Sequence, residues 1–305
     1  MAERAELMRS IETKRPNLAP ATKRVYESAL KRLKKISPNY EVEPIMAFLK
    51  TLSPPNARNH LTPLLILDNR KWKEHFDSFS ASVEKMRERQ KPSANHEKNI
   101  TSIAEIKRLI RRMKEDVNTH KLFSKTKLNT PQKRLLIAYV SFVLLLDVTM
   151  RNDSNSIKFA KRTAESDEKD NWFILATGTL SLNKFKTARS FRPRGMLPLL
   201  IRLKPSTLKV LRKFTQNHKS GDYLFSLGGG KQMSKAQHST ILTGHSFRYL
   251  GVRLGVNMLR HLVLSEFERG NPSLKERKDK MKRMQQLSLE TQMSYAWRGD
   301  EVAID

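Results

Sequence analysis

The sequence predicts a mostly helical protein of the α+β class, with an N-terminal helical bundle followed by a mainly helical domain that carries a small antiparallel sheet. Through most of the 305 residues, apolar side chains recur every three or four positions, which is the spacing of one helix face. From Trp172 to Lys186 the sequence instead holds β-branched and aromatic residues around Gly178, as strands do. The length corresponds to about two domains at about 150 residues each.

The first domain is expected over residues 1–92. Its clearest element is a helix over 20–36, in which apolar residues follow one face and Lys and Arg fill the other. Shorter helical patterns follow over 42–50 and 57–68, the first with a proline in its opening turn and the second after a Pro-Pro break. The same period continues over 76–89, so this part of the chain is predicted to be an all-helical bundle.

A linker and a second domain, over residues 100–305, are expected next. Residues 91–100 read KPSANHEKNI, with little apolar content, which is typical of a connecting segment. Ser102 and Glu105 have the spacing of a capping box before a new amphipathic helix. An apolar helix over 135–147 is expected to be buried in the core of this domain.

The small sheet is expected in the middle of the second domain. The segment 172–186 predicts two strands, and MLPLL at 196–200 predicts another that pairs with them. A helix is expected from Pro205 onward, then a short extended piece over 222–225. Most of the remaining sequence to Trp297 is expected to be helical.

The charge of the chain is strongly positive and spread along its length. Lys and Arg number 59 against 30 Asp and Glu, a formal net charge of +29. Residues 1–100 hold 20 basic and 12 acidic residues, and residues 101–305 hold 39 and 18. An acidic small-molecule substrate does not account for this excess, whereas a polyanion does, because each phosphate that is neutralised releases counterions. Nucleic acid is the favoured partner, and binding to a membrane surface or to heparin is the alternative that charge leaves open.

Several classes of protein are disfavoured by what the sequence lacks. It has no cysteine, which excludes disulfides, thiolate zinc sites, iron–sulfur ligation and cysteine nucleophiles. Its first residues lack an apolar signal segment, and its longest apolar run, 135–146, is shorter than the roughly 20 residues that a bilayer requires. The protein is therefore expected to be intracellular, neither secreted nor embedded in a membrane.

Two patterns that could bind phosphate or metal are set aside. Gly228–Lys231 lacks the first glycine and the hydroxyl residue of a phosphate-binding loop, since Phe225 and Gln232 stand in those places. The carboxylates of residues 165–170 lie in one polar run, whereas a two-metal site needs carboxylates on rigid elements. The eight histidines show no paired-ligand spacing, so no metal or other cofactor is expected.

Four residues of the second domain stand in an order that indicates chemistry. Arg151 follows the buried helix in LLLDVTMRNDS, and Lys186 ends the second predicted strand in NKFKTARSFR. Arg260 is on an apolar helix in LGVNMLRHLVLSEF, and Tyr295 follows 35 residues later in LSLETQMSYAWRG.

With these residues the sequence resembles the tyrosine recombinase, or phage integrase, family. That family has an Arg after an early helix, a Lys on a β-hairpin, a His-x-x-Arg helix and a C-terminal Tyr. The resemblance covers nearly the whole chain, including the basic N-terminal part, which is similar to the family's core-binding domain. The segments RPNLAPATKRVYESALKRL and NKFKTARSF resemble those of integrases from eukaryotic mobile elements and large DNA viruses.

The resemblance implies a site-specific recombinase or integrase that needs neither metal nor ATP. Arg151 and Arg260 would meet the extra negative charge of the pentavalent phosphate in the transition state. Lys186 would give a proton to the leaving 5′-oxygen. Tyr295 would form a 3′-phosphotyrosine that stores the bond until a second strand is joined.

Two positions depart from the family pattern. Asn257 stands three residues before Arg260, where the family usually has His, and its amide donates to a phosphate oxygen but accepts no proton at neutral pH. Gln286, nine residues before Tyr295, stands where the family has His or Trp, and its amide is also a donor. His261 is expected to be a core or surface residue, because on a helix it points about 100° away from Arg260. Reduced or context-dependent cleavage is therefore expected.

Double-stranded DNA is the expected partner. Four cations of the first amphipathic helix are candidate DNA contacts, although a solvated helix face would have the same composition: Lys23, Arg24, Lys31 and Arg32. The resemblance implies two domains that clamp duplex DNA, and a homotetramer assembled on two duplexes. It also implies a location with DNA, in a nucleus or nucleoid.

Two other functions stay open. A type IB topoisomerase would use the same phosphotyrosine chemistry to relax one duplex instead of joining two. A DNA-binding protein derived from a recombinase would keep the fold, with Asn257 as a sign of lost catalysis.

Overall fold

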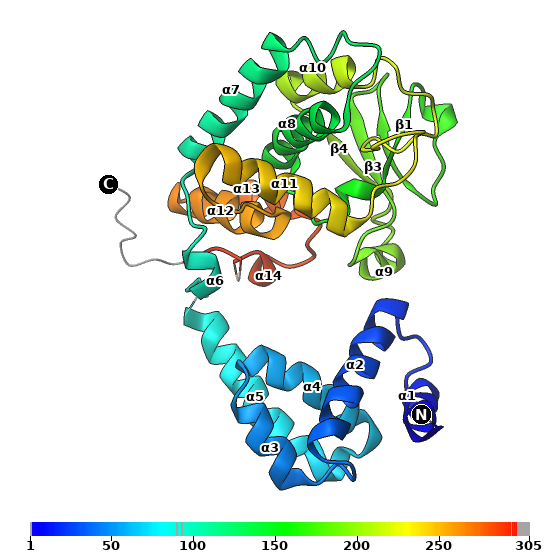
Figure 1. Cartoon of the computed structure of the whole chain (residues 1–305), viewed down its shortest axis with the longest axis vertical. Helices are drawn as coiled ribbons and strands as arrows, with labels where there is room; N and C mark the ends of the chain where they lie inside the picture. The colour runs from blue at the N-terminus through cyan, green and yellow to red at the C-terminus, as the bar shows by residue number, and fades with distance from the viewer. Residues whose placement is uncertain (1, 90, 93, 294, 298–305) are drawn as a thin grey trace. The chain divides into compact units, whose positions relative to one another are not determined.

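The chain folds into two compact units. The structure is a computed structural model that describes residues 2–89, 91–92, 94–293 and 295–297. The units span Met1–Arg89 and Gln90–Asp305 (Figure 1). The segment expected to be a linker belongs to the second unit and includes the short helix α6 (Ala94–Glu97). None of the helices in the described ranges combines the length and the apolar character that crossing a membrane requires.

The first unit is a helical bundle. Its helices are α1 (Ala2–Lys14), α2 (Pro20–Ile36), α3 (Val42–Lys50), α4 (Pro54–Leu67) and α5 (Asn69–Arg89). The predicted bounds of α2 and α3 are confirmed, whereas α4 and α5 begin earlier than their apolar periods indicate. Proline occupies the first turn of α2 and α4, where its fixed φ fits a helix and its missing N–H costs nothing.

The core of this bundle follows from the apolar stripes of its helices. Leu30 and Leu33 of α2 are fully buried, whereas the basic side chains of the same helix lie at the surface. They pack in one cluster with the buried side chains of the other four helices, which include Ile11, Ile45, Leu49, Leu61 and Trp72. The amphipathic pattern of the sequence therefore becomes an apolar interior with a cationic α2 face.

The second unit is built around α8 (Thr130–Val148). Asn129 and Gln132 form a capping box that starts this helix, and the helix is buried along most of its length. Other helices pack against it: α7 (Ile103–Thr119), α10 (Pro205–Phe214), α11 (Lys235–Leu250) and α12 (Val256–Arg269). Ser102 accepts a hydrogen bond from the backbone of Glu105, which confirms the predicted start of α7. Burial on several sides explains why α8 reads as an apolar run and not as a stripe.

A sheet of four short strands packs beside these helices. The strands are β1 (Ile157–Ala160), β2 (Asn171–Ile174), β3 (Thr179–Leu182) and β4 (Leu199–Arg202), in that spatial order. The predicted antiparallel pairings β2–β3 and β3–β4 are confirmed. The sheet as a whole is mixed, because β1 pairs with β2 in parallel. The predicted strands therefore pair antiparallel as expected, and β1 is a further, parallel strand that was not predicted.

The reason for this difference is that the β1 pairing is not local. Strand β1 has only four residues, IKFA, which are too few to show the alternating pattern of a strand. Parallel pairing also gives no hairpin signal in the sequence. The extended piece predicted at 222–225 pairs with this strand through an isolated antiparallel bridge between Tyr223 and Lys158, in which the Phe159 N–H donates to Asp222 and the Leu224 N–H donates to Ile157. Lys186, predicted at the end of the second strand, lies beyond β3 in the connection to β4, near the short helix α9 (Ala188–Phe191).

The last described residues of the chain pack against α12. Two further helices follow it, α13 (Leu274–Arg283) and α14 (Leu289–Met293). In Figure 1 these helices lie with α12 at one end of the unit, whereas α10 lies at the other end. Tyr295 packs beside the small buried cluster of Leu264, Met284 and Ala296, so the end of α13 and the segment after α14 meet on the α12 surface.

Candidate active site

A buried arginine on α12 is the centre of the candidate site. Arg260 is 1% exposed and is the largest fully buried side chain of the described chain. Its Nη2 donates to the carbonyl oxygen of Met284 at 3.2 Å, while its Nε and Nη1 have no hydrogen-bond partner among the described residues. Burial lowers the pKa of Arg260 to about 10, and the charge of Arg151 acts in the same direction. A buried guanidinium with two free donors is suited to receive an anion.

Arg151 lies close to Arg260 at the turn that ends α8. Thr149, the C-cap of α8, has a left-handed φ of 56°, and this reverses the chain so that Arg151 leaves the helix toward α13. The Arg151 backbone N–H donates to Oε1 of Gln285 at 3.1 Å. The Arg151 Nε is buried and has no partner in the described structure. Two guanidinium groups from distant parts of the sequence therefore have donors that the protein itself does not use.

Tyr295 packs directly on Arg260. The Arg260 Cζ lies 5.1 Å from the centroid of the Tyr295 ring, within the range of a cation–π contact. Tyr295 is held there by His261, whose Nδ1–H donates to the Tyr295 carbonyl oxygen at 2.7 Å. The His261 ring lies parallel to Trp297, with 4.7 Å between the ring centroids. The structure therefore brings Arg151, Arg260 and Tyr295 together.

The role of His261 differs from the one expected. It was expected to be a core or surface residue, whereas it is partly buried and contacts Tyr295 through both its ring nitrogen and its ring face. Burial lowers the pKa of His261 to about 4, so the imidazole is neutral near neutral pH. The helical periodicity of α12 does not reveal this contact, because Tyr295 reaches His261 from a segment more than 30 residues away.

Gln286 is a buried residue close in sequence to the carbonyl that accepts from Arg260, although no described contact joins its side chain to Arg151, Arg260 or Tyr295. It directly follows Gln285, two residues after the carbonyl that accepts from Arg260, and it is 1% exposed. Both polar atoms of its side chain are buried without a partner among the residues that the structure describes. Such atoms are rare in a folded protein.

Lys186 and Asn257 are placed differently from the arginines. Both side chains are exposed, and no described contact joins either of them to Arg151, Arg260 or Tyr295. Lys186 is nevertheless next to Thr187, whose Oγ1 donates to the carbonyl oxygen of Gln285 at 2.9 Å. The connection that carries Lys186 is therefore tied to the arginine cluster through the backbone of Gln285.

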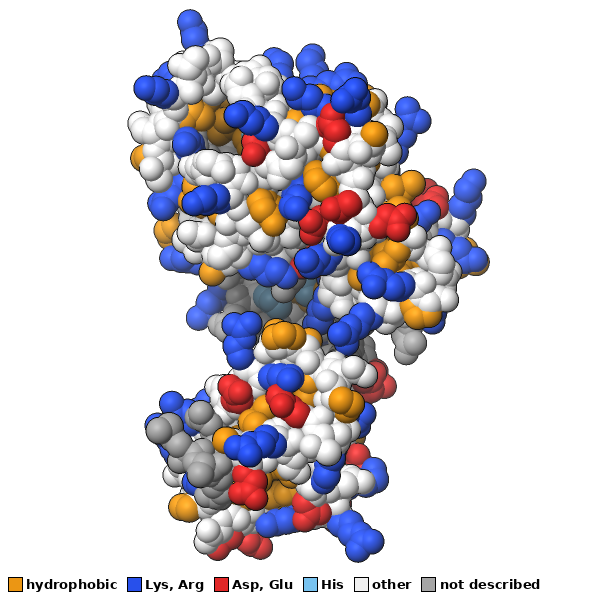
Figure 2. Space-filling view, turned by 90° about the vertical axis from the view of Figure 1, so that its right-hand side faces the viewer, with side chains coloured by type: hydrophobic (Ala, Val, Ile, Leu, Met, Phe, Trp, Pro, Cys, Tyr) orange, Lys and Arg blue, Asp and Glu red, His pale blue; other side chains and the backbone are white. Residues whose placement is uncertain are grey.

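Further cations surround the arginine cluster. Lys280 of α13 donates from Nζ to Oγ1 of Thr149 at 3.2 Å, beside the turn that bears Arg151. Burial lowers the pKa of Lys280 to about 8, and Lys204 and Arg283 lower it further. Figure 2 shows Lys and Arg side chains over much of the visible surface, with fewer acidic side chains between them. Excess positive charge at and around the site favours a polyanion.

The basic face of α2 has a mixed set of contacts. Lys23 forms an ion pair with Glu12 at 2.7 Å, and the Arg32 guanidinium lies 4.9 Å from the ring centroid of Phe48. Arg24 and Lys31 are exposed. Two of the four candidate DNA contacts therefore also have a contact within the bundle.

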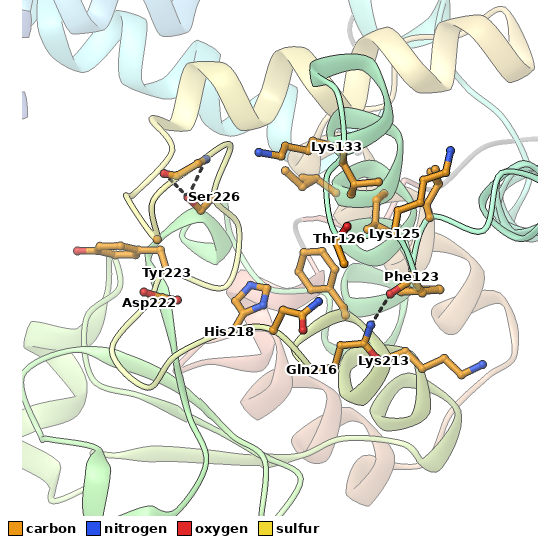
Figure 3. Close-up of a pocket in the computed structure, with 18 of the residues that line it drawn as sticks. Phe123, Lys125, Thr126, Lys133, Lys213, Gln216, His218, Asp222, Tyr223 and Ser226 are labelled. Carbon is orange, nitrogen blue, oxygen red and sulfur yellow. Dashed lines mark hydrogen bonds between the residues drawn. The ribbon is translucent and has the colours of Figure 1, made fainter.

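A separate pocket of about 290 Å³ lies away from these residues (Figure 3). Its lining includes Phe123, Lys133, His218 and Tyr223, together with the glycines at 228–230. None of the predicted site residues lines it. The Lys133 ammonium group donates a hydrogen bond to the carbonyl oxygen of Leu227 at 3.1 Å.

Acidic and histidine side chains do not gather into a metal site in the part of the chain that the structure describes. No group of three or more His, Cys, Asp or Glu residues is placed there to hold an ion. The Glu165 carboxylate, from the acidic run at 165–170, accepts hydrogen bonds from Ser220 and Arg162, which lower its pKa to about 2. These contacts are typical of a structured surface loop.

Comparison with known proteins identifies the fold. No protein-family model and no curated protein matches the sequence. A crystal structure of a lambda integrase dimer bound to a COC′ core site is similar, with a TM-score of 0.60 and 13% sequence identity over 98% of this chain and 79% of that chain. A crystal structure of XerA recombinase gives a TM-score of 0.45 and 12% identity over 97% of this chain and 94% of that chain. The likeness to the integrase shows a tyrosine recombinase fold.

Proposed function

We propose that this protein is a tyrosine-type DNA recombinase or integrase that cuts and rejoins double-stranded DNA through a 3′-phosphotyrosine intermediate. The observation that carries the proposal is the stacking of Arg260 on Tyr295, with the charge of Arg151 close enough to lower the Arg260 pKa. A phenol beside two guanidinium groups with free donors is the set that attack on a phosphodiester requires. The integrase-like fold supports the same activity.

In the proposed reaction, the Tyr295 oxygen attacks the phosphorus and the bond from phosphorus to the 5′-oxygen breaks. The phenol proton leaves to solvent, because Asn257 offers no base. Arg151 and Arg260 bind the non-bridging oxygens, where negative charge develops. Gln286 donates its side-chain N–H to the same phosphate, and Lys186 gives a proton to the 5′-oxygen. Attack by a second 5′-hydroxyl reverses these steps and releases Tyr295.

The proposal extends to the partners of the protein. The α2 cations, Arg24 and Lys31 above all, would contact DNA phosphates, and the two units would enclose the duplex. Strand exchange would take place in a homotetramer on two duplexes. The protein would accordingly reside with DNA, in a nucleus or nucleoid, and its source would be a mobile element.

The test is covalent trapping on nicked duplexes with randomised arms, which do not require the target sequence to be known. Loss of the short leaving strand prevents religation, so an active protein stays attached to DNA in a denaturing gel. We expect trapping of the unchanged protein and none with Tyr295→Phe. Tyr223→Phe, which changes a tyrosine of the separate pocket, should trap as the unchanged protein does. Equal trapping with Tyr295→Phe contradicts the proposed nucleophile.

A catalytically inactive DNA-binding protein is the second candidate, and Asn257 favours it. This exposed amide takes the position of the usual His and offers no base for the phenol proton. DNA binding without any trapping would establish this function. Relaxation of a supercoiled plasmid without joining of two duplexes would instead indicate a topoisomerase.

A further inference from the structure

The end of α13 has an unusual residue at the position where a helix commonly reverses. The Gln285 N–H donates to the carbonyl oxygen of Lys282 at 3.0 Å, and the Gln286 N–H donates to that of Met281 at 3.1 Å. This pair of bonds is the Schellman motif, whose reversing residue is usually glycine. Gln285 adopts a left-handed φ of 57° there, although a side chain disfavours that conformation. Its backbone alone therefore gives no reason for a glutamine.

The side chain of Gln285 supplies the reason. It is fully buried, and its Oε1 accepts the backbone N–H of Arg151 at 3.1 Å. Its own carbonyl oxygen accepts from Oγ1 of Thr187, the residue after Lys186. One residue thus contacts the turn that presents Arg151 and the connection that carries Lys186. Glycine at this position would suit the backbone and would lose the contact with Arg151.

The turn that bears Arg151 needs such support. Thr149, two residues earlier, is a β-branched residue with a φ of 56°, a conformation that threonine rarely adopts. Lys280 of α13 donates to Oγ1 of Thr149 at 3.2 Å, so Lys280 and Gln285, which lies two residues after the end of α13, hold this turn at two points. Strained backbone of this kind persists only where the surrounding contacts fix it, and it is concentrated at functional sites.

We propose that Gln285 is a positioning residue, which holds the Arg151 backbone so that the Arg151 guanidinium lies beside Arg260. This inference rests on the proposed function, because it assigns Gln285 a part in the cleavage attributed to that site. The hydrogen bond from Thr187 to the Gln285 carbonyl oxygen also attaches the connection that carries Lys186 to Gln285. Gln285 itself contacts no reacting atom in this scheme.

The test compares Gln285→Gly with Gln285→Glu. Glycine relieves the left-handed strain and removes the acceptor, so we expect an unchanged or higher melting temperature together with cleavage about 10- to 100-fold slower. DNA affinity should change less than the cleavage rate. Glutamate keeps an acceptor at the same reach and should restore most of the rate.

A matched control lies at the end of α7. Lys121 has a φ of 51°, and Lys121 and Leu122 make the same pair of Schellman bonds, but its side chain is exposed and no described contact joins it to Arg151. Lys121→Gly should match Gln285→Gly in stability and keep the cleavage rate of the unchanged protein. Equal cleavage rates for Gln285→Gly and the unchanged protein would overturn the inference.

A second measurement separates this inference from the proposed function. Hydrogen exchange of the Arg151 amide should be slow in the unchanged protein and in Lys121→Gly, and fast in Gln285→Gly. Unchanged protection of that amide in Gln285→Gly would overturn the positioning contact whether or not the protein cleaves DNA. Absence of trapping by the unchanged protein, with protection lost in Gln285→Gly, would overturn the proposed cleavage and leave the contact established.

Discussion

At the scale of single residues, the buried charge of Arg260 lowers the stability of the fold although it suits the site to an anion. A guanidinium that is 1% exposed and has two unpartnered nitrogens keeps its charge at a cost, which the lowered pKa records. An apolar side chain of similar length would avoid this cost. The retention of arginine at such a position is understandable if an anion enters the site and completes its hydrogen bonds.

We therefore predict that Arg260→Met raises the free energy of unfolding by about 1–3 kcal/mol and abolishes covalent trapping. Arg269→Met is the control, because Arg269 lies on the same helix and forms an exposed ion pair with Glu266. It should change stability by less than about 0.5 kcal/mol. Chemical denaturation of the three proteins measures both effects. A large loss of stability in Arg260→Met would mean that the arginine is a structural residue.

His261 links the site to pH. Its folded pKa is about 4 because burial disfavours the charged imidazole, whereas an unfolded histidine has a pKa of about 6.5. The unfolded chain therefore binds more protons between these values, and the free energy of unfolding falls as the pH falls from about 6.5 toward 4. For this residue alone, the free energy of unfolding falls by at most about 3 kcal/mol.

We predict that His261→Phe removes part of this pH dependence. Phenylalanine keeps a ring against Trp297 but lacks the donor to the Tyr295 carbonyl oxygen, so it should be less stable than the unchanged protein at pH 7.5. The difference should shrink toward pH 5, where the histidine itself becomes unfavourable. Denaturation at both pH values measures this, with the exposed His120→Gln as control. A difference that is constant with pH would contradict the prediction.

At the scale of elements, α2 is the part of the first unit most suited to DNA. Its apolar stripe is used in the bundle core, so its basic face is available. Lys23 and Arg32 share their charge with Glu12 and Phe48, whereas Arg24 and Lys31 are exposed.

We predict that Arg24→Gln combined with Lys31→Gln weakens DNA binding on every sequence tested. The slope of the logarithm of the binding constant against the logarithm of salt concentration should fall by about 2, because two phosphate contacts are lost. Lys73→Gln on α5 is the control, since that lysine pairs with Asp77 on the surface of the same unit. Fluorescence anisotropy at several salt concentrations measures the slope. An unchanged slope in the double variant would mean that this α2 face is only solvated.

The elements also show where sequence reasoning succeeds. The helices α2, α3, α7 and α8 and the β2–β3 hairpin follow from periodicity, proline placement, capping residues and β-branched composition. These signals are contained in a short stretch of chain. Strand β1 lacks such a signal, because four residues pair in parallel with a partner that no turn specifies. The parallel pairing of β1 was therefore not predicted.

At the scale of the whole molecule, the chain consists of two units. Each has its own apolar cluster; the candidate active-site residues belong to the second unit, and the four candidate DNA contacts of α2 belong to the first. The excess of positive charge extends over both parts of the sequence, so the expected partner is one that both can contact.

The candidate site was predictable in part. The order of Arg151, Arg260 and Tyr295 along the chain indicated a shared site, and the fold brings these residues together. The exposed positions of Lys186 and Asn257 were not indicated by the sequence. Neither were the contacts of His261 and Gln285, because nothing in their local pattern distinguishes them from ordinary helix residues.

The sequence by itself determined the helical character of this protein, its two-part organisation and its strong positive charge, since periodicity and composition are properties of the chain alone. Only the tertiary structure decided which side chains meet. The hydrogen bond from Arg151 to Gln285 joins residues 134 positions apart, and it exists because α8 and α13 pack in one orientation. A local pattern records which face of an element is buried, but it does not record which other element covers that face.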